Sequence, residues 1–127
     1  MSLKDLRNNE MMAHLVNALE SGKDIGHYGR LVFAMIARHF LSEKDLCHLL
    51  AKDPSMDDLK AKALVEQVCS RDYNPPRREK ILEWQGQQEF PICPTNDPDS
   101  CNVYRNLTFP DGIYDNIQEY HEQKVAS

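Results

Sequence analysis

Cys93 and Cys101 are the residues whose type and spacing first raise a question of chemistry, because they flank a short proline-containing loop. A tetrahedral zinc site needs about four ligands, often in close C-x2-C pairs, and this chain has no such pair. Cys47, Cys69 or a histidine would have to complete the site. Four cysteines could equally bind an iron–sulfur cluster, and Cys93-Pro94 is similar to the Cys-Pro step that follows some cluster ligands.

The simpler interpretation is that these four cysteines bind no metal. Cys47 and Cys69 fall in expected helices among apolar neighbours, where a thiol acts as a small hydrophobic side chain. We therefore favour no cofactor and keep zinc or an iron–sulfur cluster as the less favoured alternative. A disulfide between Cys93 and Cys101 is sterically open but is not expected in a reducing cytosol. A catalytic thiol needs a lowered pKa, and the sequence places no base beside either loop cysteine.

Basic and aromatic residues form a second chemical signal. Three basic residues stand at the start of an expected helix, where positive charge opposes the helix dipole, and a tryptophan follows them. A solvated helix face would look similar, but Trp, Tyr and Arg are also enriched at interface hot spots. We predict a partner-binding surface that includes a second aromatic–arginine pair from the irregular segment: Arg77, Arg78, Lys80, Trp84, Tyr104 and Arg105.

A polar ridge on the most apolar expected helix is the third candidate. His27, Arg30 and Arg38 lie within about 60° of one another on a helical projection, and Ala34 stands between them. This arrangement predicts a site for a flat or anionic group. The sequence leaves open whether the ridge adjoins the arginines of the later helix to form one basic cleft. His39, on an apolar stripe, is expected to be a core histidine with its hydrogen bonds satisfied.

Hydrophobic periodicity and capping residues predict the elements that position these side chains. Asp24, Ser42 and Ser55 are expected to cap helices, Asn74 before two prolines marks another start, and Gly22 marks a stop. The expected helices cover residues 3–19, 24–41, 42–53, 55–69, from 74 onward, and 111–120.

These elements predict an all-α fold, a five- or six-helix orthogonal bundle. A long irregular segment that contains prolines and cysteines, about residues 90–108, precedes the last helix. Its apolar residues, Phe90 and Ile92 among them, are expected to hold it across the helices as a clamp. The whole chain, residues 1–127, is expected to form a single helical domain with a frayed tail over about 122–127.

Composition narrows the function classes. The 127 residues are 41% hydrophobic and 28% charged, with a net charge of -5, so no global attraction to nucleic acid or anionic membranes is expected. No apolar run approaches the roughly 18 residues of a membrane span. The charged N-terminus lacks the apolar core of a signal peptide. We therefore expect a cytoplasmic protein without a membrane partner.

The sequence contains no H-E-x-x-H, P-loop, G-x-G-x-x-G or G-x-S-x-G motif. The leading hypothesis is a non-enzymatic helical interaction or regulatory module that binds a protein partner or a second copy of itself. The alternative is a nucleic-acid-associated protein with a basic cleft and a metal or iron–sulfur site. Residues 42–69 do outline a helix-turn-helix, but Asp57 and Asp58 would meet the phosphates and repel them.

Overall fold

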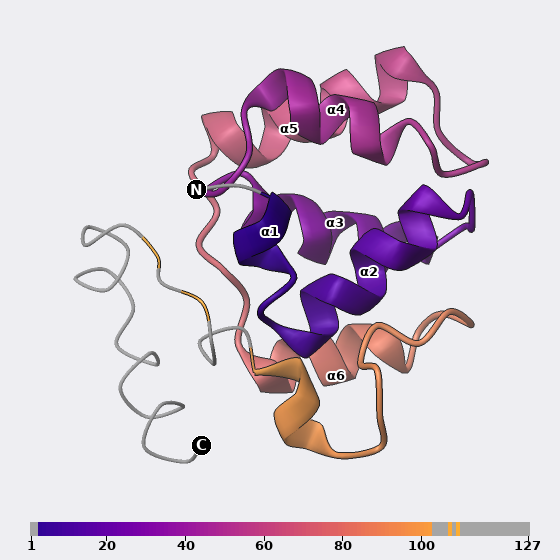
Figure 1. The fold of residues 1–127 in the computed structure, drawn as a ribbon, viewed down its shortest axis with the longest axis vertical. Coiled ribbons are helices and arrows are strands. Elements are labelled where there is room, and N and C mark those ends of the chain that lie inside the picture. The colour runs from indigo at the N-terminus through magenta and orange to yellow at the C-terminus, as the bar shows by residue number, and fades with distance from the viewer. Residues whose placement is uncertain (1–2, 103–106, 108, 110–127) are drawn as a thin grey trace.

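The computed structural model describes residues 3–102 together with Leu107 and Phe109. Over these residues the chain forms six α-helices and one short 3-10 helix, without a strand, as Figure 1 shows. The expected all-α bundle is confirmed. Nowhere in this part of the chain is a helix both long enough and apolar enough to cross a membrane. The helix expected over 111–120 lies outside the described residues.

Asn9 divides the first expected helix into α1 (Leu3–Leu6) and α2 (Glu10–Glu20). Its side-chain oxygen accepts a hydrogen bond from the backbone N–H of Met12 at 3.1 Å and so caps α2. Asparagine is favoured at a helix N-cap and is poor inside a helix. The expectation of one continuous helix over residues 3–19 was therefore wrong. Gly22 follows α2 with φ of 73°, the left-handed conformation of the expected stop.

Helix α3 (Gly26–Ala37) is central. It packs against α2, α4, α5 and α6, and in Figure 1 it lies between the α4–α5 pair and α6. Val32, Phe33 and Ile36 are fully buried in the shared core. The N-cap residue is Ile25, which makes no side-chain cap bond, so the expected cap at Asp24 was wrong. Asp24 instead lies one residue earlier and accepts a hydrogen bond from the Gly26 N–H at 2.8 Å. The helix ends at Ala37 rather than near residue 41.

Helices α4 (Glu43–Leu50) and α5 (Asp58–Ser70) form an antiparallel pair on the side of the molecule away from α6, seen at the top of Figure 1. Ser42 caps α4 as expected, because its hydroxyl accepts a first-turn backbone N–H at 3.1 Å. Asp57, not Ser55, caps α5 with a contact of 2.8 Å. A carboxylate at this position also interacts favourably with the helix dipole.

Helix α6 (Arg78–Gln85) begins later than expected. Asn74 and Pro75 each precede a proline, and the residue before a proline is pushed away from helical geometry. Both prolines are buried, and Arg77 with φ of -71° and ψ of 155° is the last extended residue. The expected helix start at Asn74 was therefore wrong.

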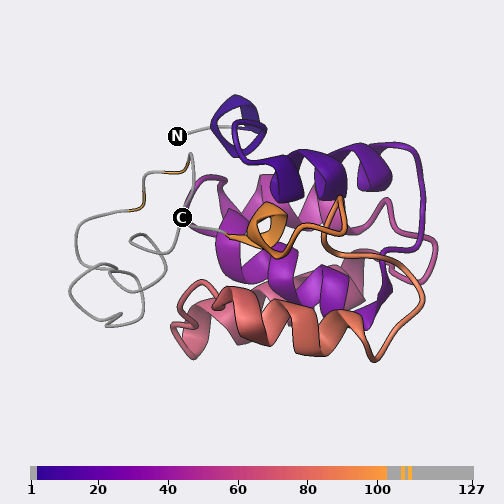
Figure 2. The same cartoon turned by 90° about the horizontal axis from the view of Figure 1, so that it is seen from below.

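Residues 89–102, which we call the strap, contain the 3-10 helix η1 (Pro98–Cys101) and are otherwise irregular. Helix η1 packs against α6 and α2, and Figure 2 shows the strap running between these two helices. Ile92 and Asn102 are almost completely buried. Residues 89–102 therefore lie across two helices, whereas residues 103–106 and 108 of the segment expected to act as a clamp lie outside the described residues.

Candidate functional site

A stacked pair of aromatic rings joins α3 to α6. The rings of Tyr28 and Trp84 lie with their centroids 5.7 Å apart and their planes 15° from parallel, and both side chains are partly exposed. Lys80, one turn before Trp84, places its ammonium group 5.5 Å from the centroid of that ring. His27 is exposed, and its ring packs against that of Tyr28 in a T-shaped arrangement with the ring centroids 5.1 Å apart. We call His27, Tyr28, Lys80 and Trp84 the aromatic patch.

Two glutamines after α6 hold the patch in place. The Tyr28 hydroxyl donates to the side-chain oxygen of Gln87 at 3.1 Å, and the Tyr28 backbone N–H donates to that of Gln88 at 2.9 Å. The Gln88 amide nitrogen donates in turn to the carbonyls of Ile25 and Phe90. Gly26 adopts φ of +81°, a conformation that favours glycine, and a Cβ there would also meet the end of the Gln88 side chain. Sequence reasoning missed both glutamines because they follow the last helical turn.

Arg30 does not present a free charge on the expected ridge. Its guanidinium pairs with Asp24 at 2.9 Å and with Asp53 at 3.1 Å. Asp53 is buried and also accepts the backbone N–H groups of Ile25 and Ser55. Arg30 therefore neutralises a buried carboxylate and ties the α4–α5 loop to the start of α3.

Arg38 is also paired with groups of this chain rather than free to bind an anion. It donates to Asp72 at 2.7 Å and, through two nitrogens, to the carbonyl of Tyr73. Ala34, expected to leave a gap on the ridge, is fully buried. The anion site expected from His27, Arg30 and Arg38 is thus not formed as a ridge, because both arginines turn toward carboxylates that are remote in sequence.

The predicted partner-binding residues divide into three groups. Lys80 and Trp84 lie in the aromatic patch. Arg77 is exposed at the start of α6, and Arg78, mostly covered, lies 3.5 Å from Glu79. Tyr104 and Arg105 lie outside the described residues.

Cys93 and Cys101 are joined by a disulfide, with their Cα atoms 5.2 Å apart, a separation that suits the bond. The expectation of unbonded loop cysteines was therefore wrong, and neither sulfur is a thiol in this form. Cys47 and Cys69 are free and lie on α4 and α5, at the opposite side of the bundle from η1 in Figure 1. Among residues 3–102, 107 and 109, no group of three or more His, Cys, Asp or Glu side chains could hold a metal.

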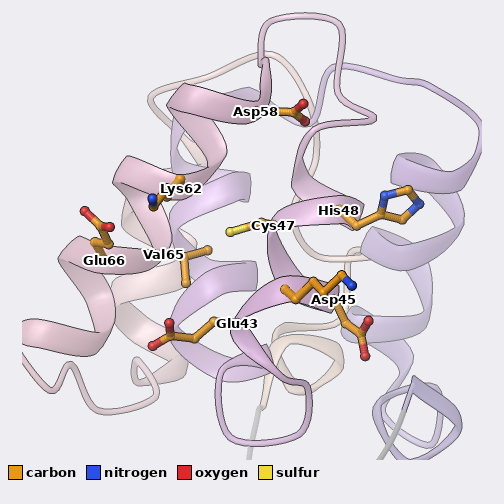
Figure 3. A pocket seen from close by; sticks show the side chains of 9 residues that line it. Glu43, Asp45, Cys47, His48, Asp58, Lys62, Val65 and Glu66 are labelled. Carbon is orange, nitrogen blue, oxygen red and sulfur yellow. The ribbon is translucent and has the colours of Figure 1, made fainter.

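Between α4 and α5 the surface is hollowed, with a volume of about 570 Å³. Figure 3 shows Cys47 facing this space, with Val65 across from it and charged side chains around the rim. Burial, and then the Glu43 carboxylate, raise the pKa of the Cys47 thiol. The thiol is therefore protonated near neutral pH and is a poor nucleophile. The rim carries both signs of charge, as its lining shows: Glu43, Lys44, Asp45, His48, Asp58, Lys62 and Glu66.

His39 is not the satisfied core histidine expected from the sequence. Its Nε2 is buried and has no hydrogen-bond partner within the described residues. Its ring meets Phe109 edge-on at 5.7 Å. Burial, followed by the charge of Arg38, lowers the pKa of His39 to about 4. The ring is therefore neutral at physiological pH and acts as an apolar packing surface.

No protein-family model, curated protein or solved structure matches this chain. The function is therefore inferred from the local chemistry alone. The aromatic patch is the place where exposed rings, a cation and rigid support come together.

Proposed function

We propose that this chain is a non-enzymatic interaction module that binds a partner protein through the aromatic patch. One observation supports this most strongly: Tyr28 and Trp84 stack across two helices, partly exposed, with Lys80 over the tryptophan. Large aromatic side chains provide most of the binding energy at many interfaces. Because Gln87 and Gln88 already hold the tyrosine, binding would cost little further ordering of side chains.

The charges around the patch favour a protein over a nucleic acid. Lys80 lies 3.4 Å from Glu83, and both Glu79 and Glu83 are exposed on the same helix. Carboxylates here would repel a phosphate backbone. Arg30 and Arg38, which a basic cleft would need, are already paired. A mixture of charges around aromatic side chains instead suits the polar rim of a protein interface.

Site-specific photo-crosslinking in cells tests this proposal. A photoreactive phenylalanine analogue replaces Glu83, beside the patch, or Lys60, an exposed residue of α5. We expect a defined protein adduct from position 83 and none of that mass from position 60. Adding Trp84→Leu or Lys80→Glu should reduce the adduct by about tenfold, as for loss of a hot-spot contact.

Three results would contradict the proposal. Equal adducts from both positions would show no preference for the patch. An adduct that contains nucleic acid would support the alternative function. An adduct unaffected by Trp84→Leu in a folded variant would remove the aromatic pair from the interface. An adduct with a second copy of this chain would identify the partner as the protein itself.

A further inference from the structure

The strap is connected to the aromatic patch through the end of α6. The backbone N–H of Cys93 donates to the side-chain oxygen of Gln85, the residue after Trp84, at 2.6 Å. The Gln88 amide bonds the carbonyl of Phe90 and also the backbone of Tyr28. Cys93 is thus hydrogen-bonded to the residue that follows Trp84, and Phe90 is hydrogen-bonded to the glutamine that holds Tyr28.

The middle of the strap contains a local turn. The backbone carbonyl of Asp97 accepts the N–H and the hydroxyl of Ser100. Thr95, Asn96 and Asp97 are exposed. The strap is attached at both ends by hydrogen bonds to helix α2 and its cap. The Pro91 carbonyl lies 2.8 Å from Nε2 of His14, and the Asn102 carbonyl accepts from the side-chain amide of Asn9 at 3.1 Å. The Cys93–Cys101 bond closes the loop between these ends.

We propose that the Cys93–Cys101 disulfide is a reversible redox latch that holds the strap closed and so keeps the aromatic patch ordered. Disulfides that form in a reducing cytosol are usually transient or redox-sensing, and the chain is expected to be cytoplasmic. Both half-cystines are buried, Cys93 at 4% and Cys101 at 0% exposure. A reductant therefore reaches the bond only when the irregular strap opens locally.

The chemistry is ordinary thiol–disulfide exchange with a low-molecular-weight thiol as reductant. A thiolate attacks one sulfur, the Cys93–Cys101 bond breaks, and a mixed disulfide forms. A second small thiol releases it, so the protein gains two thiols, and the two small thiols leave as one disulfide. The reverse exchange with a small disulfide closes the latch. Cys47 and Cys69 take no part, because they lie on α4 and α5.

The latch would regulate the proposed binding of a partner protein, and its biological role rests on that proposed function. Its physical test needs no partner, because Trp84 is the only tryptophan and reports on the patch directly. The full chain is equilibrated in glutathione buffers of graded redox ratio. Thiols are counted by alkylation and mass spectrometry, acrylamide quenching of Trp84 is measured, and hydrogen exchange is followed over the strap.

We expect two alkylated thiols in the oxidised protein and four in the reduced protein. Reduction should raise strap exchange by about tenfold, with increased Trp84 quenching at the same midpoint, as for a local opening. A Cys93→Ser/Cys101→Ser variant should behave as reduced protein in every buffer. A matched Cys47→Ser/Cys69→Ser variant should keep the full response.

Each other outcome overturns the latch. Four reactive thiols in every buffer would mean that the disulfide does not form. Reduction without a change in strap exchange or quenching would separate the bond from the patch. Loss of far-ultraviolet circular dichroism on reduction would make the bond a general structural staple. If the latch responds but photo-crosslinking from position 83 fails, the proposed interaction falls while the redox device remains.

Discussion

Helix α3 and the strap are neighbours that are stabilised by different interactions. Helix α3 buries Val32, Phe33 and Ile36 completely and contacts four other helices. The strap buries a smaller set, Ile92 and the two half-cystines, and is also held by single hydrogen bonds and one disulfide. Apolar burial is distributed over many atoms, whereas a hydrogen-bonded anchor depends on one residue. The helical core should therefore unfold as a unit, and the strap should open separately.

Substitution of the core should give the largest effect. Phe33→Ala removes a fully buried ring at the centre of α3 and should lower the free energy of unfolding by about 4 kcal/mol. Urea denaturation measures this change. Leu59→Ala is the matched control, because Leu59 is 80% exposed and its loss should cost less than about 0.5 kcal/mol. Equal losses in the two variants would show that α3 is not the structural centre.

The buried carboxylate beside α3 should give the next largest effect. Asp53→Ala leaves Arg30 without its buried partner and removes the acceptor for two backbone N–H groups. We expect a loss of about 3 kcal/mol in unfolding free energy. Asp24→Ala removes the exposed partner of the same arginine and should cost only about 1 kcal/mol. A reversed order would mean that the exposed pair holds the loop to α3.

An anchor of the strap should show a smaller and more local effect. Asn9→Ala removes both the cap of α2 and the bond to the Asn102 carbonyl, a loss of about 2 kcal/mol. Asn9→Ser keeps a capping oxygen but not the amide donor, and should cost about half as much. Hydrogen exchange should show faster exchange over the strap in both variants. If exchange rises uniformly across the molecule instead, the strap and core do not open separately.

The contrast between core and strap also explains what the sequence could predict. Helical periodicity is local, so the bundle, the stop at Gly22 and the cap at Ser42 were predictable. The cap bond from Met12 to Asn9 is local and was missed, whereas the second bond of Asn9, to the carbonyl of Asn102, is remote in sequence and could not be predicted. The same is true of Arg30, which pairs with Asp53. Apolar patterns report burial, but they do not report which distant polar groups meet.

The aromatic patch was predictable only in pieces. Lys80 and Trp84 were expected to bind a partner, and His27 was placed with a different group of residues. Packing of α3 against α6 brings them together around Tyr28. The disulfide was missed for another reason: pairing of Cys93 with Cys101 was sterically open, and the expected cytosolic location argued against it.

The smallest expected effect is on the pH dependence of the free energy of unfolding, and it involves the last described residue of the chain. His39 of the core packs edge-on against Phe109, and burial lowers its pKa from 6.5 to about 4. The unfolded chain therefore binds a proton below about pH 6.5, whereas the folded protein does so only near pH 4. Since the unfolded state binds more protons in this window, the free energy of unfolding falls as the pH drops from about 6.5 to about 4 and then levels.

Because the ring is partly exposed, solvent screening limits this change to about 1 kcal/mol. Urea denaturation between pH 7 and pH 4 measures it. His39→Phe retains a ring against Phe109 without a titrating group, so its stability should vary less with pH over the same range. Leu59→Ala, at an exposed and non-titrating position of α5, is the control and should leave the wild-type slope unchanged. If the free energy of unfolding of His39→Phe varies with pH as in the wild type, other groups cause the acid sensitivity. The contact between His39 and Phe109 would then not depend on a neutral imidazole.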